Sequence, residues 1–255
     1  MLKNTLLDYR DTIFYLSILE FKVKYSGTIL GLIWSVIEPV AQLVVLYVVF
    51  SVLNPSTDTL IIHLFTGLIM VQFFSRSTTQ GMFSLFLKKP IILSINIPKM
   101  IFPFSSVLTQ LWLFFIEIII LFIFIIYFNL EINLSFFMLI PIFGLLIVLT
   151  SGISILLSVI VSYLRDFQTV WGIITMSLIF ITPVFWNVSD MPKEFSDIFL
   201  LNPLASLIEM SHQIILYNTL PSTFDILYST IVSFGVLFLA VIIFKKTEKK
   251  LVELF

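Results

Sequence analysis

The sequence predicts an all-α, polytopic membrane protein with six transmembrane helices, and its composition is the first indication. Of its 255 residues, 59% are apolar and only 11% are charged, and the mean hydropathy is +1.12. Soluble domains average roughly 45–50% apolar and about 25% charged residues, so a soluble globular enzyme is excluded. The absence of cysteine, with only 8 Gly and 10 Pro, also excludes disulfide-rich and collagen-like proteins.

Six stretches are long and apolar enough to cross a bilayer, which takes about 20 residues of helix. They are Ile29–Leu53, Leu60–Leu87, Ile101–Phe128, Ser135–Ser162, Phe167–Asn187 and Phe224–Phe244. A polar run from Ser75 to Gln80 interrupts the second stretch, and the fifth is short and contains Pro183. Both still have apolar flanks, so each is expected to span.

The basic residues lie almost entirely on one side of these spans. Of the 14 Lys and Arg residues, only Lys193 falls on the other side, a split of 13 to 1, or 12 to 1 if Arg76 lies inside the membrane. The positive-inside rule then places both termini in the cytoplasm. We expect one domain in the cytoplasmic membrane, with a cytoplasmic or interfacial segment over residues 1–28, a six-span bundle over 29–244 and a cytoplasmic tail over 245–255.

The N-terminal segment has the pattern of an amphipathic helix. Apolar side chains recur at spacings of 4, 3, 4 and 3 residues, with polar ones on the opposite side. The apolar set is Leu2, Leu6, Tyr9, Ile13 and Leu16, and the polar set is Asn4, Asp8 and Asp11. A helix lying in the membrane interface is favoured over a plain cytosolic helix.

Residues 188–223, between the fifth and sixth spans, are too apolar for a solvated loop. They contain the run Ile198–Leu201 and then an apolar pattern from Leu204 to Leu216 with a period near 3.6. Two short helices that dip back into the membrane fit this pattern better than a loop does. We therefore expect a re-entrant pair.

The sequence contains no motif of an enzyme or a metal site. None of the glycines stands in a phosphate-binding run that ends in Lys-Ser/Thr, so the chain is expected neither to hydrolyse nucleotide nor to carry a cofactor. His63 and His212 have neither His-x-x-x-His spacing nor a Cys partner. The net charge of −1 gives no indication of a nucleic-acid partner, and none is expected.

Three ionisable residues, Glu38, Arg76 and Glu117, fall inside the predicted spans, where each costs several kcal/mol unless paired or hydrated. Counted from the outer ends of their spans, Glu38 lies roughly 22 Å deep and Arg76 roughly 24 Å, whereas Glu117 lies roughly 16 Å deep. A pair between Glu38 and Arg76 is therefore favoured. The alternative is that Glu38 or Glu117 faces a water-filled conduit.

Aromatic residues are abundant, with 28 Phe, 8 Tyr and 4 Trp. Most are expected to face lipid, to pack between helices or to form interfacial belts. A minority can do more, because an aromatic face stacks on the apolar C–H face of a sugar while letting it slide. The candidates for such a path, from spans one and five, are Trp34, Tyr47, Phe50, Phe180 and Phe185.

The run KVKYSGTILGLIW at residues 22–34, followed by Glu38-Pro39, resembles the start of span one in type-2 ABC transporter permeases that export polysaccharides, including O-antigen and teichoic acid exporters. Four later sequence motifs of that family follow in the same order as in those permeases, over nearly the whole chain. They are Lys88-Lys89 through Pro98-Lys99, Tyr163 to Asp166, Thr182 to Trp186 and Asn202 to Leu204. Lys24 and Thr182 depart mildly from the family pattern, where Arg and Ser are common.

The resemblance implies that the chain is half of a channel. Two copies would pair, and each would dock a separate cytosolic ATPase subunit that carries the ATP and Mg. Lys88, Lys89 and Lys99 would belong to a coupling helix seated on that ATPase, and Arg165 and Asp166 would make a second, smaller contact. The alternatives are an ordinary basic loop for the first segment and helix capping for the second.

The substrate implied by the resemblance is a lipid-linked glycan that moves outward through an aromatic-lined, water-accessible lumen. Spans one and five are expected to meet across the dimer and to line that lumen. Two other functions stay open at this point: a type-2 permease for a lipid or a drug, and a non-transporting assembly subunit of a membrane complex.

Overall fold

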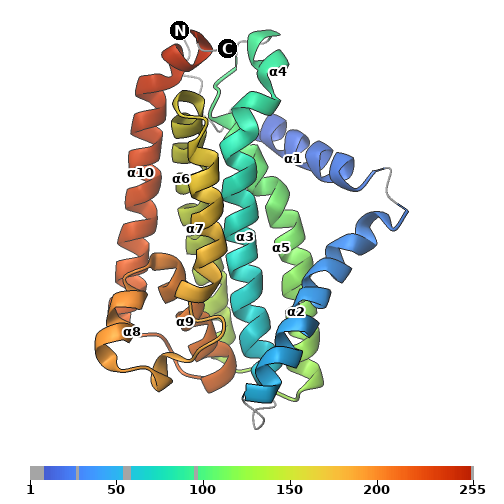
Figure 1. Ribbon diagram of the computed structural model, residues 1–255, viewed down its shortest axis with the longest axis vertical. Coiled ribbons are helices and arrows are strands. Elements are labelled where there is room, and N and C mark those ends of the chain that lie inside the picture. The colour runs from blue at the N-terminus through green and yellow to red at the C-terminus, as the bar shows by residue number, and fades with distance from the viewer. Residues whose placement is uncertain (1–8, 27–28, 54–58, 95–96, 254–255) are drawn as a thin grey trace.

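The computed structural model describes residues 9–26, 29–53, 59–94 and 97–253, and within these ranges the regular elements are all helices (Figure 1). They are α1 (Arg10–Tyr25), α2 (Trp34–Leu53), α3 (Leu60–Leu87), α4 (Lys89–Ser94), α5 (Ile101–Tyr127), α6 (Leu139–Tyr163), α7 (Phe167–Ile181), α8 (Lys193–Leu200), α9 (Pro203–Tyr217) and α10 (Thr223–Glu253). The long helices stand side by side in alternating directions. The short helix α4 lies at one end of this bundle, the α4 end, and α8 and α9 lie at the other (Figure 1).

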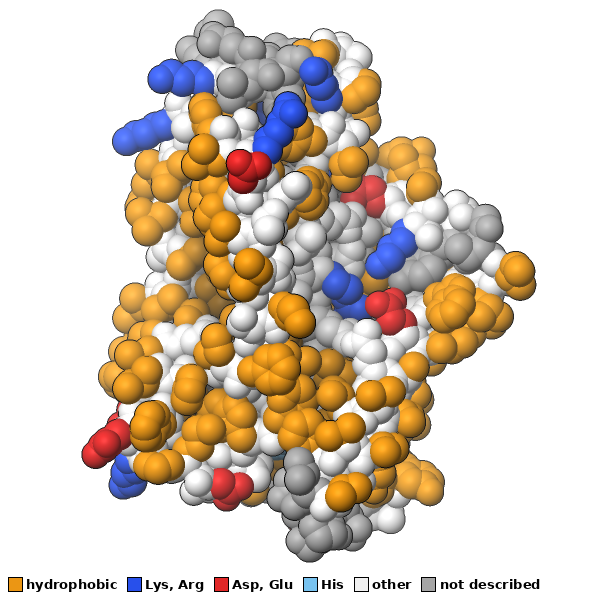
Figure 2. Space-filling model, in the orientation of Figure 1, with side chains coloured by type: hydrophobic (Ala, Val, Ile, Leu, Met, Phe, Trp, Pro, Cys, Tyr) orange, Lys and Arg blue, Asp and Glu red, His pale blue; other side chains and the backbone are white. Residues whose placement is uncertain are grey.

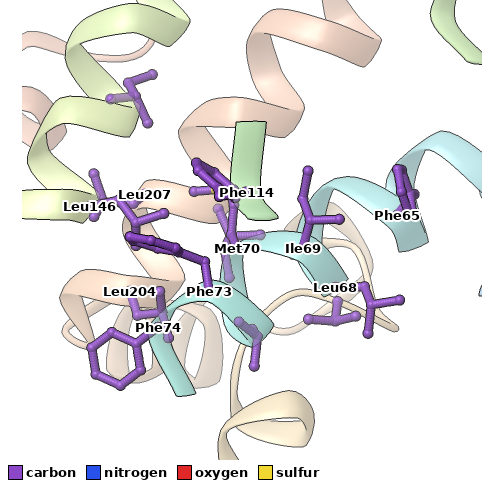
Figure 3. Packing of buried hydrophobic residues seen from close by; sticks show 14 of the residues in the cluster. Phe65, Leu68, Ile69, Met70, Phe73, Phe74, Phe114, Leu146, Leu204 and Leu207 are labelled. Atoms are coloured by element: carbon purple, nitrogen blue, oxygen red, sulfur yellow. The ribbon is translucent and has the colours of Figure 1, made fainter. Parts of the chain in front are cut away.

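Helix α3 forms the centre of the bundle. Of its most apolar stretch, 78% is buried, against 17% for α2 and for α10. Its side chains interdigitate with those of α5, α6 and α9 (Figure 3), and Phe73 of α3 stacks on Phe114 of α5 with ring centroids 4.7 Å apart. Because lipid is as apolar as these side chains, close van der Waals packing holds such a centre together in a bilayer.

Helices α6 and α10 approach closely at Gly152. A Cβ atom at this position would lie 2.8 Å from the backbone nitrogen of Leu237 and 2.9 Å from its Cα. Small residues allow this kind of backbone approach in membrane proteins. The glycine therefore fixes how α10 lies against α6.

Within the described residues, five helices are long and apolar enough to cross a bilayer, namely α2 with its preceding turn, α3, α5, α6 with its preceding turn, and α10. Helix α7 runs beside them but has only 15 residues, or about 22 Å of helix. The predicted fifth span, Phe167–Asn187, is therefore wrong at its C-terminal end. Thr182 is extended (φ −97°, ψ 155°), as the residue before a proline commonly is, and the helix stops before it.

Helices α8 and α9 meet at a bend of 111°. Asn202 caps α9 by accepting a hydrogen bond from the backbone N–H of Leu204 at 3.0 Å, with Pro203 at the first helical position. The preceding helix ends and the following helix begins at the same end of the bundle (Figure 1). Helices α8 and α9 thus form the re-entrant pair that the sequence predicts.

Helix α1 slants outward from the bundle near the α4 end, and the chain returns along α2 from an elbow at residues 29–33 that projects from the bundle (Figure 1). Ile13 and Ser17 form its buried face, which packs on α5. Leu2, Asn4, Leu6 and Asp8 of the predicted amphipathic pattern lie outside the described residues. At the elbow, Gly31 has a φ of +51°, which favours glycine, and the chain turns there into a 3-10 turn (Gly31–Ile33) before α2.

Candidate functional site

One side of α3 carries polar side chains through the middle of the membrane-spanning bundle. Gln72, Ser75, Arg76, Thr79 and Gln80 recur at helical spacing, and all five are partly exposed. The side chains between them, such as Phe73 and Phe74, are buried. We call these five residues the polar face of α3. In the sequence, four of these residues belong to the polar run Ser75–Gln80, which hydropathy alone shows only as an interruption of the span.

Arg76 pairs with Glu117 of α5, with Nη2 and Oε1 2.6 Å apart. The side chains are 20% and 1% exposed, respectively. Arg76 Nε and Glu117 Oε2 are both buried without a hydrogen-bond partner. Protein atoms therefore satisfy only part of the hydrogen-bonding capacity of the two side chains.

The predicted pair between Glu38 and Arg76 is wrong. Glu38 is exposed on α2, and the ion pair of Arg76 is with Glu117. The physical reason is the placement of the helices: α5 packs along α3, whereas α2 begins at the elbow, away from the bundle (Figure 1). The helix packed against α3 supplies the partner, although depth counted along the sequence favours Glu38.

Charged side chains gather in a hollow between the bundle and the arm formed by α1 and α2 (Figure 2). Lys24 of α1 contributes to this group. Burial and the neighbouring Arg76 lower the pKa of Lys24, while Glu38 and Glu117 oppose that shift. The charges of Arg76, Glu38 and the buried Glu117 thus all act on Lys24.

Amide side chains connect the polar face of α3 to its neighbours. Gln72 donates to Gln42 of α2, and Gln110 of α5 donates to Gln80. Interhelical hydrogen bonds of this kind stabilise membrane helix pairs. The face is therefore held by α2 and α5 and yet stays partly exposed.

At the α4 end, the structure corrects two of the predicted docking lysines. Lys88 is directed inward and pairs with Glu20 of α1, and its side chain is 12% exposed. Lys99 is 8% exposed, its Nζ donates to the carbonyl oxygen of Ile97, and its backbone N–H donates to Glu248. Sequence counting treats both as loop cations, but both are bound within the chain.

An exposed surface nonetheless remains at the α4 end, and we call it the coupling surface. It mixes apolar side chains with charges, and the guanidinium of Arg165 lies over the ring of Phe86 at 5.5 Å, next to α4. Its members are Leu87, Lys89, Ile91, Leu93, Tyr163, Leu164, Arg165 and Asp166. The two predicted docking segments are thus neighbours in space.

Three of the five predicted path aromatics are in contact. Phe50 of α2 stacks on Phe185 with centroids 4.7 Å apart and an interplanar angle of 10°, and Phe180 lies 5.7 Å from Phe185. The first and fifth segments therefore meet within a single chain. Trp34 at the elbow and Tyr47 are exposed, and among the described residues no ring contact joins them to this cluster.

The two histidines lie together at the end opposite α4. The rings of His63 and His212 stack 3.9 Å apart, and His212 Nε2 is 3.1 Å from the carbonyl oxygen of His63. Within the described ranges, no group of three or more His, Cys, Asp or Glu side chains could hold a metal ion. The stack ties α9 to α3.

Comparisons with known proteins agree with this architecture. The family model described as ABC-2 type transporter matches residues 12–216. The chain is 28% identical over 238 residues to an O-antigen export system permease protein RfbA of Klebsiella pneumoniae, covering 92% of this chain and 91% of that protein. It is 25% identical to the protein of the same name from Myxococcus xanthus, over 99% and 98% of the two chains. It is 24% identical to a polysialic acid transport protein KpsM of Escherichia coli, over 90% and 91%.

Proposed function

The chain belongs to the ABC-2 type transporter family, and we propose that it is the permease subunit of an ATP-driven exporter that moves a lipid-linked polysaccharide across the cytoplasmic membrane. The names of its relatives, which export O-antigen and transport polysialic acid, support this substrate class. The energy source would be a separate cytosolic ATPase, which carries ATP and Mg and docks on the coupling surface. Both termini and the α4 end would face the cytoplasm.

The observation that carries the proposal is the polar face of α3. Hydrogen-bonding side chains are costly against lipid and are retained in membrane helices where they face protein or a water-filled cavity. Amides and hydroxyls such as those of Gln72, Ser75 and Thr79 can exchange hydrogen bonds with sugar hydroxyls without binding one sugar tightly. A polar polymer that must slide requires many weak contacts of this kind.

The hollow between the arm and the bundle supports the way such a substrate would reach the path. A lipid-linked glycan has a tail that must stay in the bilayer and a polar chain that must leave it. An opening between helices, lined by Arg76 and Glu38 at its edge, would let the tail remain in lipid while the sugar chain meets α3. A second copy of this chain would close the conduit on its other side, and the aromatic cluster at Phe50 and Phe185 would lie toward its outer end.

The test is export by the assembled transporter in cells. Thr79→Phe narrows the proposed path, whereas Ile231→Phe puts the same ring on the exposed side of α10 as a matched control. We expect lipid-linked polymer to accumulate inside cells that carry the first variant and not inside those that carry the second, at equal amounts of permease in the membrane. Normal export by Thr79→Phe would remove α3 from the path. Failure of a gene deletion to cause accumulation would overturn the proposed function as a whole.

A further inference from the structure

Lys88 occupies a junction at which several helices are joined. Its backbone N–H donates to the carbonyl oxygen of Ser84 at 3.3 Å and so closes α3. Its own carbonyl oxygen accepts from the N–H groups of Ile91 and Ile92, each at 3.0 Å, and so caps the first turn of α4. A movement of α4 therefore moves the backbone of Lys88 with it.

The side chain of Lys88 connects this junction to α1. Its Nζ pairs with Oε1 of Glu20 and lies 3.1 Å from Ser105 Oγ of α5. Burial lowers the pKa of Lys88, and the neighbouring Glu20 carboxylate opposes that shift. The pairing with Glu20 thus compensates for the partial burial of the ammonium group.

Both oxygens of the Glu20 carboxylate have a polar neighbour. Besides the contact of Oε1 with Lys88, its Oε2 accepts a hydrogen bond from Gln80 Nε2 at 2.8 Å and lies 3.2 Å from Thr109 Oγ1. Trp112 of α5 adds a ring contact to Phe14 of α1, with centroids 5.7 Å apart. Of these contacts, the one with Lys88 leads directly to α4.

The chain that follows α4 is attached to α10. The backbone N–H of Lys99, just before α5, donates to Glu248 Oε1 of α10 at 2.8 Å. The exposed residues of α4 thus lie between one attachment to α1 and another to α10. Of the two, only α1 continues through the Gly31 elbow into the arm that borders the hollow.

We propose that the Glu20–Lys88 pair is a mechanical joint that transmits displacement of α4 to α1, so that α1 and the arm move when a partner pushes on α4. This inference rests on the proposed function, because the push comes from the ATPase. Glu20 and Lys88 are positioning residues: they act through the arm on the width of the hollow and need not touch the substrate. A static brace that only holds α1 in place is the alternative.

The experiment measures the movement itself in the full complex of permease and ATPase in lipid nanodiscs. The chain contains no cysteine, so Tyr15→Cys on α1 and Phe238→Cys on α10 introduce two thiols for spin labels at exposed positions. The distance between the labels is measured by pulsed electron paramagnetic resonance with and without a non-hydrolysable ATP analogue.

The test variant is Glu20→Gln. It removes the charge but keeps the size and the hydrogen-bonding capacity toward Gln80. Asp11→Asn removes a charge from the exposed Arg10–Asp11 contact of the same helix and is the control.

We expect the nucleotide to change the label distance in the native chain and in Asp11→Asn, and the change to be lost in Glu20→Gln. Export per ATP hydrolysed should fall at least fivefold in Glu20→Gln, while complex assembly and basal ATP hydrolysis stay within twofold. Lys88→Met should give the same pattern. A full distance change in Glu20→Gln, or no change in the native complex, would overturn the joint. Failure of the native chain to assemble with any ATPase encoded beside its gene would instead overturn the proposed function.

Discussion

Two ion pairs, Lys88–Glu20 and Arg76–Glu117, each join a cation on or next to α3 to a carboxylate of another helix. The two pairs differ in how many of their buried atoms have partners. Lys88 and Arg76 lie about 18 Å apart along the helix axis. Near Lys88, Glu20 Oε1 lies in an ion pair and makes no further hydrogen bond, and Glu20 Oε2 accepts from Gln80 and Thr109. Near Arg76, Glu117 Oε2 and Arg76 Nε have none, although the carboxylate is the more deeply buried of the two.

From this difference we infer different roles for the two pairs. A buried polar group without a partner costs roughly 1–3 kcal/mol, more when charged, and Arg76 Nε and Glu117 Oε2 both carry a cost of this kind. The Arg76 side chain is 20% exposed, so water or a hydroxyl group can reach the exposed part of its guanidinium. In the proposed exporter, the Glu20–Lys88 pair would transmit movement and the Arg76–Glu117 pair would border the substrate path.

The largest effect is expected from Arg76→Met. It leaves the carboxylate of Glu117 buried without a countercharge, which typically costs about 3–5 kcal/mol. The free energy of unfolding, measured by denaturant titration in detergent micelles, should fall by that amount. Adding Glu117→Leu should recover much of the loss, because a well-packed apolar pair can replace a buried ion pair. A double variant as unstable as the sum of the two single variants would contradict this account of the pair.

A smaller effect is expected from Glu20→Ala. Lys88 and Gln80 lose an acceptor, but their side chains lie near the end of the bundle, where water can replace it, so the free energy of unfolding should fall by about 1–3 kcal/mol. Hydrogen exchange of α1 should accelerate more than that of α3. A loss larger than that of Arg76→Met would reverse the comparison between the two pairs.

The smallest effect is expected from Glu38→Gln. The side chain is exposed and does not pair with Arg76, so the free energy of unfolding should change by less than about 0.5 kcal/mol. In a double-mutant cycle with Arg76→Gln, the two changes should add to within about 0.5 kcal/mol. A coupling of 1 kcal/mol or more, on the scale of residues in contact, would restore the pair expected from depth alone.

Hydropathy predicted most of the fold, because length and apolarity determine which segments cross a bilayer. The partner of Arg76 could not be predicted in the same way. Counting residues from a helix end gives depth, but it does not say which neighbouring helix faces the arginine. Because α5 packs along α3, the carboxylate that reaches Arg76 is that of Glu117 and not that of Glu38.

Two other features were visible in the sequence but interpreted incompletely. The polar face of α3 is one: its five residues recur at helical spacing and so define one side of a helix. Hydropathy alone shows only a polar interruption of the span there. Pro183 likewise marks the end of α7. The inward direction of Lys88 could not be found, because it depends on a carboxylate in another helix, Glu20, that is distant in sequence.

The attachment of α1 also has a consequence for biosynthesis. Glu20 leaves the ribosome before the residues that bind it, and the last of these, Thr109, belongs to the third spanning helix. Helix α1 therefore cannot dock during its own synthesis and must wait at the membrane surface until α3 and α5 have been inserted. Helix α1 is made before α3 and α5 but docks only after both, so its docking reports that these two helices have come together.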